Sequence, residues 1–213
     1  MKLILLGPPG AGKGTHSDIL AKKQRIPTIS TGNILRAAVK NGTPVGLRAK
    51  EYMDGGKLVP DEVIIGVISE RLQEQDCAGG YILDGVPRTI PQAEALESAG
   101  IVFDHVVSLE ISDEEIVKRM EGRRVCSGCG ASYHVINVPP KREGICDVCG
   151  GALEFRSDDQ PSVVRTRLQV YHEETEPLKS FYGERGLLRK VSDQNELQKT
   201  QGKIQEALGM KNP

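Results

Sequence analysis

The chain has 213 residues, of which 38% are hydrophobic, and its formal net charge is −1. This length supports one sizeable core with small inserts, and the near-zero charge provides no whole-molecule field to attract nucleic acid or an anionic membrane. No apolar run approaches the roughly 20 residues of a membrane-spanning helix, and the apolar run after Met1 is shorter than that of a signal peptide. We therefore expect a soluble, cytoplasmic protein with no nucleic-acid or membrane partner.

Short apolar segments alternate along the chain with segments of helical periodicity. The strand candidates are Lys2 to Leu6, Thr28 to Ser30, Tyr81 to Leu83, His105 to Glu110 and Leu188 to Val191. The helix candidates begin after Lys13 and continue with Asn33 to Lys40, Thr43 to Asp54, Asp61 to Gln75, Ile90 to Ala99, Asp113 to Glu121, Pro161 to Gly183 and Glu196 to Leu208. This alternation predicts an α/β fold in which a parallel five-stranded sheet is flanked by helices.

A glycine-rich run from Gly7 to Thr15 follows the first strand candidate. Glycines let the backbone turn tightly and point its N–H groups inward, the next helix adds the positive end of its dipole, and Lys13 can reach the β- and γ-phosphates. The residue after Lys13 is Gly14, so the hydroxyl that usually contacts Mg²⁺ is displaced to Thr15, which argues against a plain GTPase or motor ATPase. The run predicts a P-loop for a nucleoside triphosphate. Its expected ligands are Gly10, Ala11, Gly12, Lys13, Gly14 and Thr15.

Charged residues follow two further strand candidates. Asp84 and Arg88 come at the end of the third strand, at the carboxyl edge of the sheet where ligands of open α/β folds bind. Asp84 is placed like a Walker B acid that orients Mg²⁺, and Arg88 directs the opposite charge at a phosphate. Arg36 lies one helical turn beyond the second strand and can face the same edge, although an exposed helix arginine is the commoner situation.

Four of the five cysteines form two C-x-x-C pairs separated by sixteen residues. The pairs are Cys126 with Cys129 and Cys146 with Cys149. This spacing is typical of a zinc ribbon, and four thiolates leave no open coordination position, so we expect a structural Zn²⁺. A reducing cytosol disfavours the alternative of disulfides. We expect His134 to be an ordinary surface histidine.

The periodicity also divides the chain. Residues 122–159 lack a helical period and hold the cysteines, which predicts a metal-stabilised insert, and residues 31–59 form a second, helical insert. The predicted core domain then consists of residues 1–30, 60–121 and 160–213. Cys77, outside both inserts, is expected to be a small, buried or partly buried residue. Residues 209–213 are expected to be frayed.

The chain resembles the adenylate kinases, a family of nucleoside monophosphate kinases, along nearly its whole length. The motifs that carry the resemblance occur in family order: the P-loop, Ser30-Thr31-Gly32, Asp84-Gly85-Val86-Pro87-Arg88 and Gly122-Arg123-Arg124-Val125. The resemblance implies the P-loop NTPase-type fold, with residues 31–59 as an AMP-binding insert and residues 122–159 as a long, zinc-binding lid. It also implies a monomer. Val86 departs from the phenylalanine usual in the family, which we expect to remove an aromatic wall near the nucleotide.

The resemblance also implies roles for individual residues. Thr31 would contact the AMP base, Arg36 its phosphate, and Gln92 the adenine edge. The other AMP ligands implied are Lys57 and Val59, whose backbone groups close over the adenosine, together with Gly85, Arg88, Arg156 and Arg167. Arg123, Arg156 and Arg167 would surround the transferring phosphoryl group.

Around ATP, the resemblance implies that Arg119 stacks on the adenine and that Asp158 and Asp159 tie the closed lid to the arginines or to metal-bound water. Gln194 or Asn195 would lie near the same adenine. The catalytic set implied is Lys13, Asp84, Arg88, Arg123, Arg156, Asp158, Asp159 and Arg167. No general base is required, because the acceptor is an already ionised phosphate.

The activity implied is reversible phosphoryl transfer from MgATP to AMP, giving two ADP. A kinase with UMP or CMP as the acceptor is the nearest alternative, and Thr31, Gln92 and the long lid count against it. A zinc-ribbon ATPase that binds nucleic acid would need a basic stripe with aromatics, yet aromatics make up only 4% of the chain. A non-enzymatic nucleotide sensor would not need Arg36, Arg88 and Arg123 together.

Overall fold

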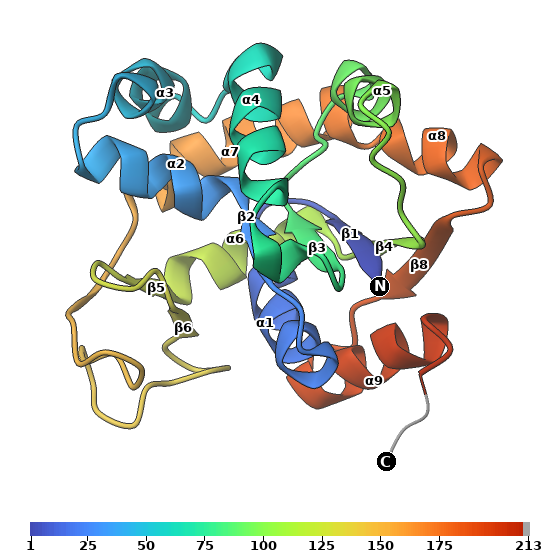
Figure 1. Ribbon diagram of the computed structural model, residues 1–213. Coiled ribbons are helices and arrows are strands. Elements are labelled where there is room, and N and C mark those ends of the chain that lie inside the picture. The colour runs from blue at the N-terminus through green and yellow to red at the C-terminus, as the bar shows by residue number, and fades with distance from the viewer. Residues whose placement is uncertain (211–213) are drawn as a thin grey trace.

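The computed structural model describes residues 1–210, in which a parallel sheet carries helices on both faces (Figure 1). The strands of this sheet are β1 (Lys2–Leu6), β2 (Thr28–Ser30), β3 (Tyr81–Asp84), β4 (His105–Glu110) and β8 (Leu188–Ser192). Their order is β2-β3-β1-β4-β8, and every pairing is parallel. The predicted five-stranded parallel sheet is confirmed, and β3 and β8 each extend one residue further than the sequence indicated.

The sheet topology places the glycine-rich loop at the point where the strand order reverses. β1 lies between β3 and β4, and its register pairs Leu5 with Asp84 and Leu6 with Ser108. The chain moves to one side of β1 to form β2 and β3, and to the other side to form β4 and β8. A crevice opens at such a switch point, outside the carboxyl ends of the strands. The loop after β1 and the residues after β3 therefore share one edge.

Nine α-helices are described within residues 1–210. They are α1 (Lys13–Gln24), α2 (Thr31–Lys40), α3 (Pro44–Asp54), α4 (Asp61–Leu72), α5 (Ile90–Ser98), α6 (Asp113–Gly122), α7 (Pro161–Val170), α8 (Leu178–Glu184) and α9 (Leu197–Ala207). Short turns of other helix types are η1 (Gln75–Cys77), η2 (Ser157–Asp159) and the π-helix η3 (Tyr171–Thr175). Hydroxyl side chains cap α2, α3, α5 and α6 by accepting a backbone N–H. None of these helices is long and apolar enough to cross a membrane.

The prediction of a single helix from Pro161 to Gly183 is wrong. The segment divides into α7, the π-turn η3 and α8. Pro177 stands at the start of α8, and because proline has no N–H it interrupts the helical hydrogen-bond ladder there. The wider π-turn lets Thr175 donate its hydroxyl to the Arg88 carbonyl at 2.8 Å. The break therefore ties this segment to the loop after β3.

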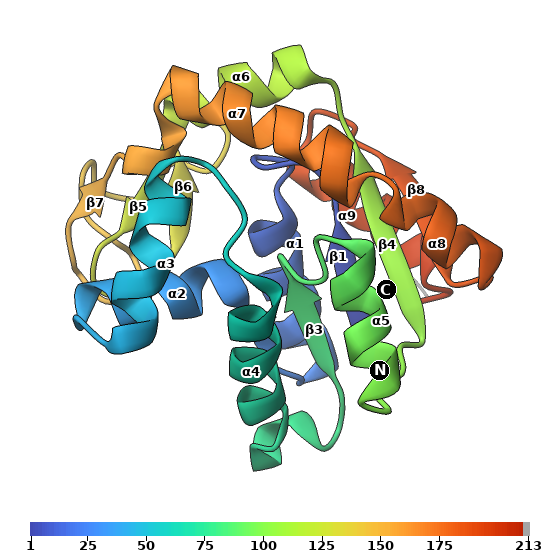
Figure 2. The same ribbon diagram turned by 90° about the horizontal axis from the view of Figure 1, so that it is seen from above.

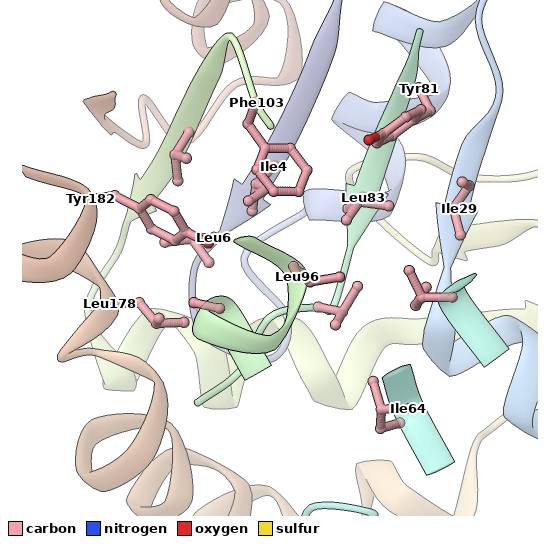
Figure 3. Close-up of a cluster of buried hydrophobic side chains, with 14 of the residues drawn as sticks. Ile4, Leu6, Ile29, Ile64, Tyr81, Leu83, Leu96, Phe103, Leu178 and Tyr182 are labelled. Atoms are coloured by element: carbon pink, nitrogen blue, oxygen red, sulfur yellow. The ribbon is translucent and has the colours of Figure 1, made fainter. Parts of the chain in front are cut away.

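The alternation of side chains along β1 builds a core on each face of the sheet. Ile4 and Leu6 face α4, α5 and α8, where Figure 3 shows them near Leu96 and Tyr182. Leu3 and Leu5 point to the opposite side and pack in a second cluster with residues of α1, α6, α7 and α9. Both clusters are almost fully shielded from water. This packing fixes the strand ends on which the site is built.

Residues 122–159, which we call the lid after the role expected of them, contain strands that the sequence did not predict. β5 (Arg123–Cys126), β6 (Ser132–His134) and β7 (Leu153–Glu154) form a small antiparallel sheet of order β6-β5-β7. The lid lies beside α2 and α3 (Figure 2). Lys40 on α2 donates from Nζ to the Ser127 carbonyl at 2.7 Å. The lid thus touches the helical insert, residues 31–59, directly.

The C-terminal end of α9 is held against the core. The Met210 amide donates to the Gln205 carbonyl at 2.9 Å, and the Met210 side chain packs on the cluster around Leu3 and Leu5. The predicted fraying therefore does not fit residues 209 and 210. For residues 211–213 the expectation lies outside the described residues. Cys77 is buried, as predicted.

Candidate active site

The glycine-rich run forms a tight loop between β1 and α1. Gly10 and Gly12 have φ angles of 83° and 88°, a region that favours glycine. A Cβ at Gly10 would lie 2.7 Å from the Met120 sulfur on α6, so a larger residue would force that side chain to move. Gly12 also stands at the N-terminus of α1, whose first N–H groups have no partner within the helix. The loop is thus shaped to hold an anion at that helix end.

Within residues 1–210, Lys13 has no anionic partner in hydrogen-bond contact. Its Nζ donates to the carbonyls of Gly7 at 2.7 Å and Pro8 at 2.8 Å, so the ammonium folds back on the loop. Burial lowers the pKa of Lys13 to about 8, because the charged form loses hydration. Neighbouring arginines lower it further, and only Asp84 acts to raise it. A bound phosphate would supply the negative charge that this ammonium lacks.

Arg88, in the loop after β3, and Thr31, at the start of α2, converge on the carbonyl of Gly85. Arg88 donates to this oxygen from Nε at 2.8 Å, and Thr31 donates to it from Oγ1 at 3.0 Å. Gly85 has a φ of 83°, and a Cβ there would lie 3.0 Å from both side chains. Asp84 sits next to the start of α1, where its Oδ2 would be 3.6 Å from a Cβ on Gly14. The structure therefore brings Asp84, Thr31 and Arg88 to the loop, as the sequence indicated.

Val86 is not part of a nucleotide wall. The side chain is 1% exposed and packs in the core cluster that also holds Leu83 and Leu96. It contributes to neither of the cavities described below. The expectation that Val86 removes an aromatic wall near the nucleotide is wrong, because the chain turns this side chain toward the sheet. Because valine is smaller than phenylalanine, the difference affects the packing of this core cluster instead.

Arginines and carboxylates from the two ends of the lid form a single ion-pair network. Arg123 donates from Nε to Asp159 Oδ2 at 2.7 Å, and Arg156 donates from Nε to Asp158 Oδ1 at 2.7 Å. Arg167 on α7 lies 3.2 Å and 3.3 Å from carboxylate oxygens of Asp158 and Asp159. α6 and α7, which lead into and out of the lid, run side by side above the site (Figure 2). Paired carboxylates thus hold the guanidinium groups in place.

The network carries a surplus of positive charge in a poorly hydrated region. Burial, with the charge of Arg156 nearby, lowers the pKa of Arg36 to about 9. Burial likewise lowers the pKa of Arg167 to about 10, although Asp158 opposes the shift. Burial alone would raise the pKa of Asp158, but Arg167 and Arg156 hold it well below its ordinary value. The cations outnumber the carboxylates, so the site favours a highly charged anion.

Two adjoining cavities of about 250 Å³ and about 120 Å³ open at this edge of the sheet. Arg123 and Asp84 line the larger one, and Asp158 lines the smaller one. The residues common to both cavities are Pro9, Lys13, Gly32, Arg36, Gly85, Arg88, Arg156 and Arg167. Two ligands could therefore meet at the arginine cluster. Of the predicted loop ligands, Ala11 lines neither cavity, since it is buried and its amide donates to the Pro8 carbonyl.

The far end of the larger cavity lies between the lid and the segment after β8. Arg119 is held there by Asp193, with Nη2 to Oδ2 at 2.6 Å, and by Glu115, with Nε to Oε1 at 3.3 Å. Asn195 also lines this end and accepts from Arg119 Nη2 at 3.3 Å, which distinguishes it from Gln194. The fixed guanidinium plane offers a stacking surface for a flat ring.

The smaller cavity is bounded by the helical insert and by residues that follow β3. Lys57 and Val59 line it from the end of the insert, and Thr31 lines it from the start of α2. Gln92 on α5 is 2% exposed and forms another wall. The residues that the resemblance implied for AMP therefore gather in one cavity, although they come from different segments of the chain.

Comparisons with known proteins agree over almost the whole length of the chain. A family model described as adenylate kinase matches residues 5–187. The chain is 53% identical to an adenylate kinase of Caldicellulosiruptor bescii over 99% of this chain and 100% of that protein. It is 51% identical to one of Carboxydothermus hydrogenoformans over 98% of this chain and 99% of that protein. The identity to one of Lachnospira eligens is 54%, over 90% of this chain and 92% of that protein.

This chain belongs to the adenylate kinase family. Family membership confirms the resemblance that the P-loop and the motifs after it indicated. The structure adds His16, Asp193, Glu196 and Leu197 to the larger cavity of this adenylate kinase, and sequence reasoning did not select them. None of these residues belongs to a recognised sequence motif. The segment that ends β8 and begins α9 comes close to His16 on α1 only in the folded chain.

His16 is the most notable of these additions. It is 3% exposed, and its Nδ1 lies 2.7 Å from Gln201 Oε1 on α9. Burial lowers the pKa of His16, which favours the neutral ring. His16 therefore brings a neutral, buried ring to the larger cavity of the adenylate kinase.

The four predicted metal ligands come together in the lid. The sulfur atoms of Cys126, Cys129, Cys146 and Cys149 all lie within 4.8 Å of one another. Backbone N–H groups of Gly128 and Val148 donate to two of these sulfurs at 3.3 Å and 3.4 Å, as in a knuckle that wraps a thiolate. The donor set fits a tetrahedral ion with soft ligands, and Zn²⁺ is the metal that such a site usually holds.

His134 is more than an ordinary surface histidine. Its Nδ1 accepts from the backbone N–H groups of Ile136 and Asn137, each at 3.1 Å. The ring packs against Gly122, where a Cβ would lie 2.4 Å from Nε2, and it lines the larger cavity. The expectation of a simple surface residue is therefore wrong. His134 orders the turn after β6 and stands apart from the sulfur cluster.

Proposed function

We propose that this adenylate kinase transfers the terminal phosphoryl group of MgATP to AMP, reversibly, and so forms two molecules of ADP. The observation that carries the proposal is that two cavities of unequal size meet at one cluster of cations. A phosphoryl group can pass directly between two nucleotides only where their phosphates meet. The cluster supplies positive charge at that point, which is the main requirement of this chemistry.

On the donor side, we place the ATP phosphates in the loop and the adenine against Arg119. The loop ligands are Gly10, Gly12, Lys13, Gly14 and Thr15, with Ala11 supporting the loop from within. Thr15 and Asp84 would orient Mg²⁺, which neutralises charge on the β- and γ-phosphates when it is bound. Arg123 would reach the transferring group from the lid.

On the acceptor side, we place AMP in the smaller cavity. Thr31, Val59 and Gln92 would surround the base, with Lys57 and Gly85 contributing backbone groups. Arg36 and Arg88 would hold the AMP phosphate, and Arg156 and Arg167 would lie between the two phosphate chains. An oxygen of the AMP phosphate would then attack the γ-phosphorus in line. Positioning and charge neutralisation supply the acceleration, since the attacking oxygen is already ionised.

We propose that the lid closes over the reacting phosphates and keeps water away from them, since water would otherwise compete with AMP for the phosphoryl group. Asp158 and Asp159 would act by holding the arginines in their closed positions. The Cys₄ site would hold a structural Zn²⁺, which stiffens a lid too small to form its own core. Residues 31–59 would close over AMP, and the remaining segments, 1–30, 60–121 and 160–213, would form the rigid core.

We further propose that the enzyme acts as a monomer in the cytoplasm, with ATP, AMP and ADP as its only required partners. Four cysteines that serve as thiolate ligands need a reducing compartment, and the same compartment holds the nucleotide pool. No second chain is needed to complete either cavity, because residues of this chain supply every proposed ligand.

A coupled assay of ADP formation tests the proposed function. MgATP is supplied with AMP, UMP, CMP or GMP, each separately and at equal concentration. Fast ADP production with AMP alone would support the proposal. Turnover only with UMP or CMP would move the assignment to a pyrimidine nucleotide kinase, and turnover without any acceptor would indicate an ATPase.

A further inference from the structure

The side-chain amide of Gln92 is held on two sides by groups of fixed polarity. Its Oε1 accepts from the backbone N–H of Arg88 at 2.7 Å, and its Nε2 donates to Asp61 Oδ1 at 2.6 Å. The second oxygen of Asp61 accepts from the Thr89 hydroxyl at 3.2 Å, which fixes the carboxylate. Asp61 is the first residue of α4 and does not line the smaller cavity. It contacts Gln92 from outside that cavity.

These contacts allow only one orientation of the amide. A carboxylate accepts hydrogen bonds and a backbone N–H donates them. Rotation of the Gln92 amide by half a turn would place its NH₂ group against the Arg88 N–H and its oxygen against Asp61. Both contacts would then be repulsive, and Gln92 is too buried for water to compensate. Asp61 therefore helps to decide which end of the amide is the donor.

The two contacts together use half of the hydrogen-bonding capacity of the amide, one of its two N–H donors and one of its two oxygen lone pairs. One N–H and one oxygen lone pair of Gln92 remain available to the cavity. Adenine presents an acceptor at N1 next to a donor at its 6-amino group, which complements this pair. Hypoxanthine and guanine present the reverse, a donor at N1 and an acceptor at O6. Such a base would match only the rotated amide.

We infer that Asp61 is a positioning residue that sets the base specificity of the AMP site by fixing the orientation of the Gln92 amide. This inference rests on the proposed function, because it takes Gln92 as the residue that faces the acceptor base. α4 and α5 pack together, so the contact joins the start of α4, just after the AMP-binding insert, to the base wall. An aspartate whose only role was to begin α4 would have no effect on the choice of base.

The experiment compares Asp61→Asn with Glu62→Gln in the full-length enzyme. Both variants remove one carboxylate charge from the first turn of α4, but Glu62 is exposed and, within residues 1–210, pairs only with Arg48. The kcat and KM are measured for AMP and for IMP at saturating MgATP, together with the KM for ATP. Because the asparagine amide can turn either way, we expect Asp61→Asn to lower the preference for AMP over IMP about tenfold, mainly through the KM for AMP. The KM for ATP and all constants of Glu62→Gln should stay as in the wild type.

A second comparison tests whether the effect passes through Gln92. In a Gln92→Ala background, adding Asp61→Asn should leave unchanged the ratio of kcat/KM for AMP to kcat/KM for IMP. An unchanged ratio in the single Asp61→Asn variant would overturn the inference. So would a loss of preference for AMP that is as large in the Gln92→Ala background as in the wild-type background. If Asp61→Asn does not fold, Asp61→Ser takes its place, with the same results expected. Wild-type enzyme that does not phosphorylate AMP would instead refute the proposed function.

Discussion

The pKa of Lys13 leads to a pH dependence of ATP binding. In the absence of nucleotide, burial and nearby arginines lower this pKa to about 8 from the ordinary value of 10.5. Bound phosphates bring negative charge to the ammonium and raise its pKa again. ATP therefore binds the charged form of Lys13, and binding above pH 8 requires the uptake of a proton. The affinity for ATP should fall as the pH rises.

The magnitude follows from the protonated fraction. With one titrating group, the dissociation constant is proportional to 1 + 10^(pH − 8), which rises about tenfold between pH 7 and pH 9. Isothermal titration calorimetry with a non-hydrolysable ATP analogue, at constant free Mg²⁺, measures this dissociation constant. Buffers of different ionisation enthalpy should also report proton uptake near pH 8. Lys13→Arg is the matched control, because a guanidinium stays charged through this range and should give a nearly flat profile.

A dissociation constant that stays constant from pH 7 to pH 9 in the wild type would refute this reasoning. It would mean that Lys13 keeps its proton in the free enzyme, although its hydrogen-bond partners among the described residues are the carbonyls of Gly7 and Pro8 alone. An equal pH dependence in Lys13→Arg would also refute it, since the titrating group would then be another residue.

Three further predictions concern single parts of the site. Arg88→Ala should lower kcat at least about a hundredfold in the coupled ADP assay, because a guanidinium at the junction of the two cavities is lost; a kcat within threefold of the wild type would contradict this. Gly85→Ala should raise the KM for AMP about tenfold, because its φ of 83° and the crowding by Thr31 and Arg88 strain any side chain, while the KM for ATP stays constant. Removal of the metal by a chelator should lower the melting temperature by several degrees, with the loss of activity secondary, and calorimetry showing no change would exclude a structural metal.

The sequence determined the features that depend on local spacing. The β1 strand and the glycine-rich loop are adjacent in the chain, so their geometry follows from glycine, proline and the helix that begins at Lys13. The cysteine pairs predicted a common site because each C-x-x-C turn brings two sulfurs together by itself. The alternation of apolar strands and helical segments likewise predicted the parallel sheet, since crossover helices between successive strands cover both of its faces.

Only the tertiary structure decided which distant residues meet. The ladder that pairs Leu5 with Asp84 sets the carboxylate beside the loop, and the packing of α9 on α1 brings Gln201 to His16. Val86 is buried in the core cluster with Leu83 and Leu96, a placement that no local pattern contains. Asp61 belongs to no sequence motif. Its contact with Gln92 exists because α4 and α5 pack on the same face of the sheet. A short motif predicts the backbone conformation of its own segment, whereas the partners of a side chain depend on how the helices pack on the sheet.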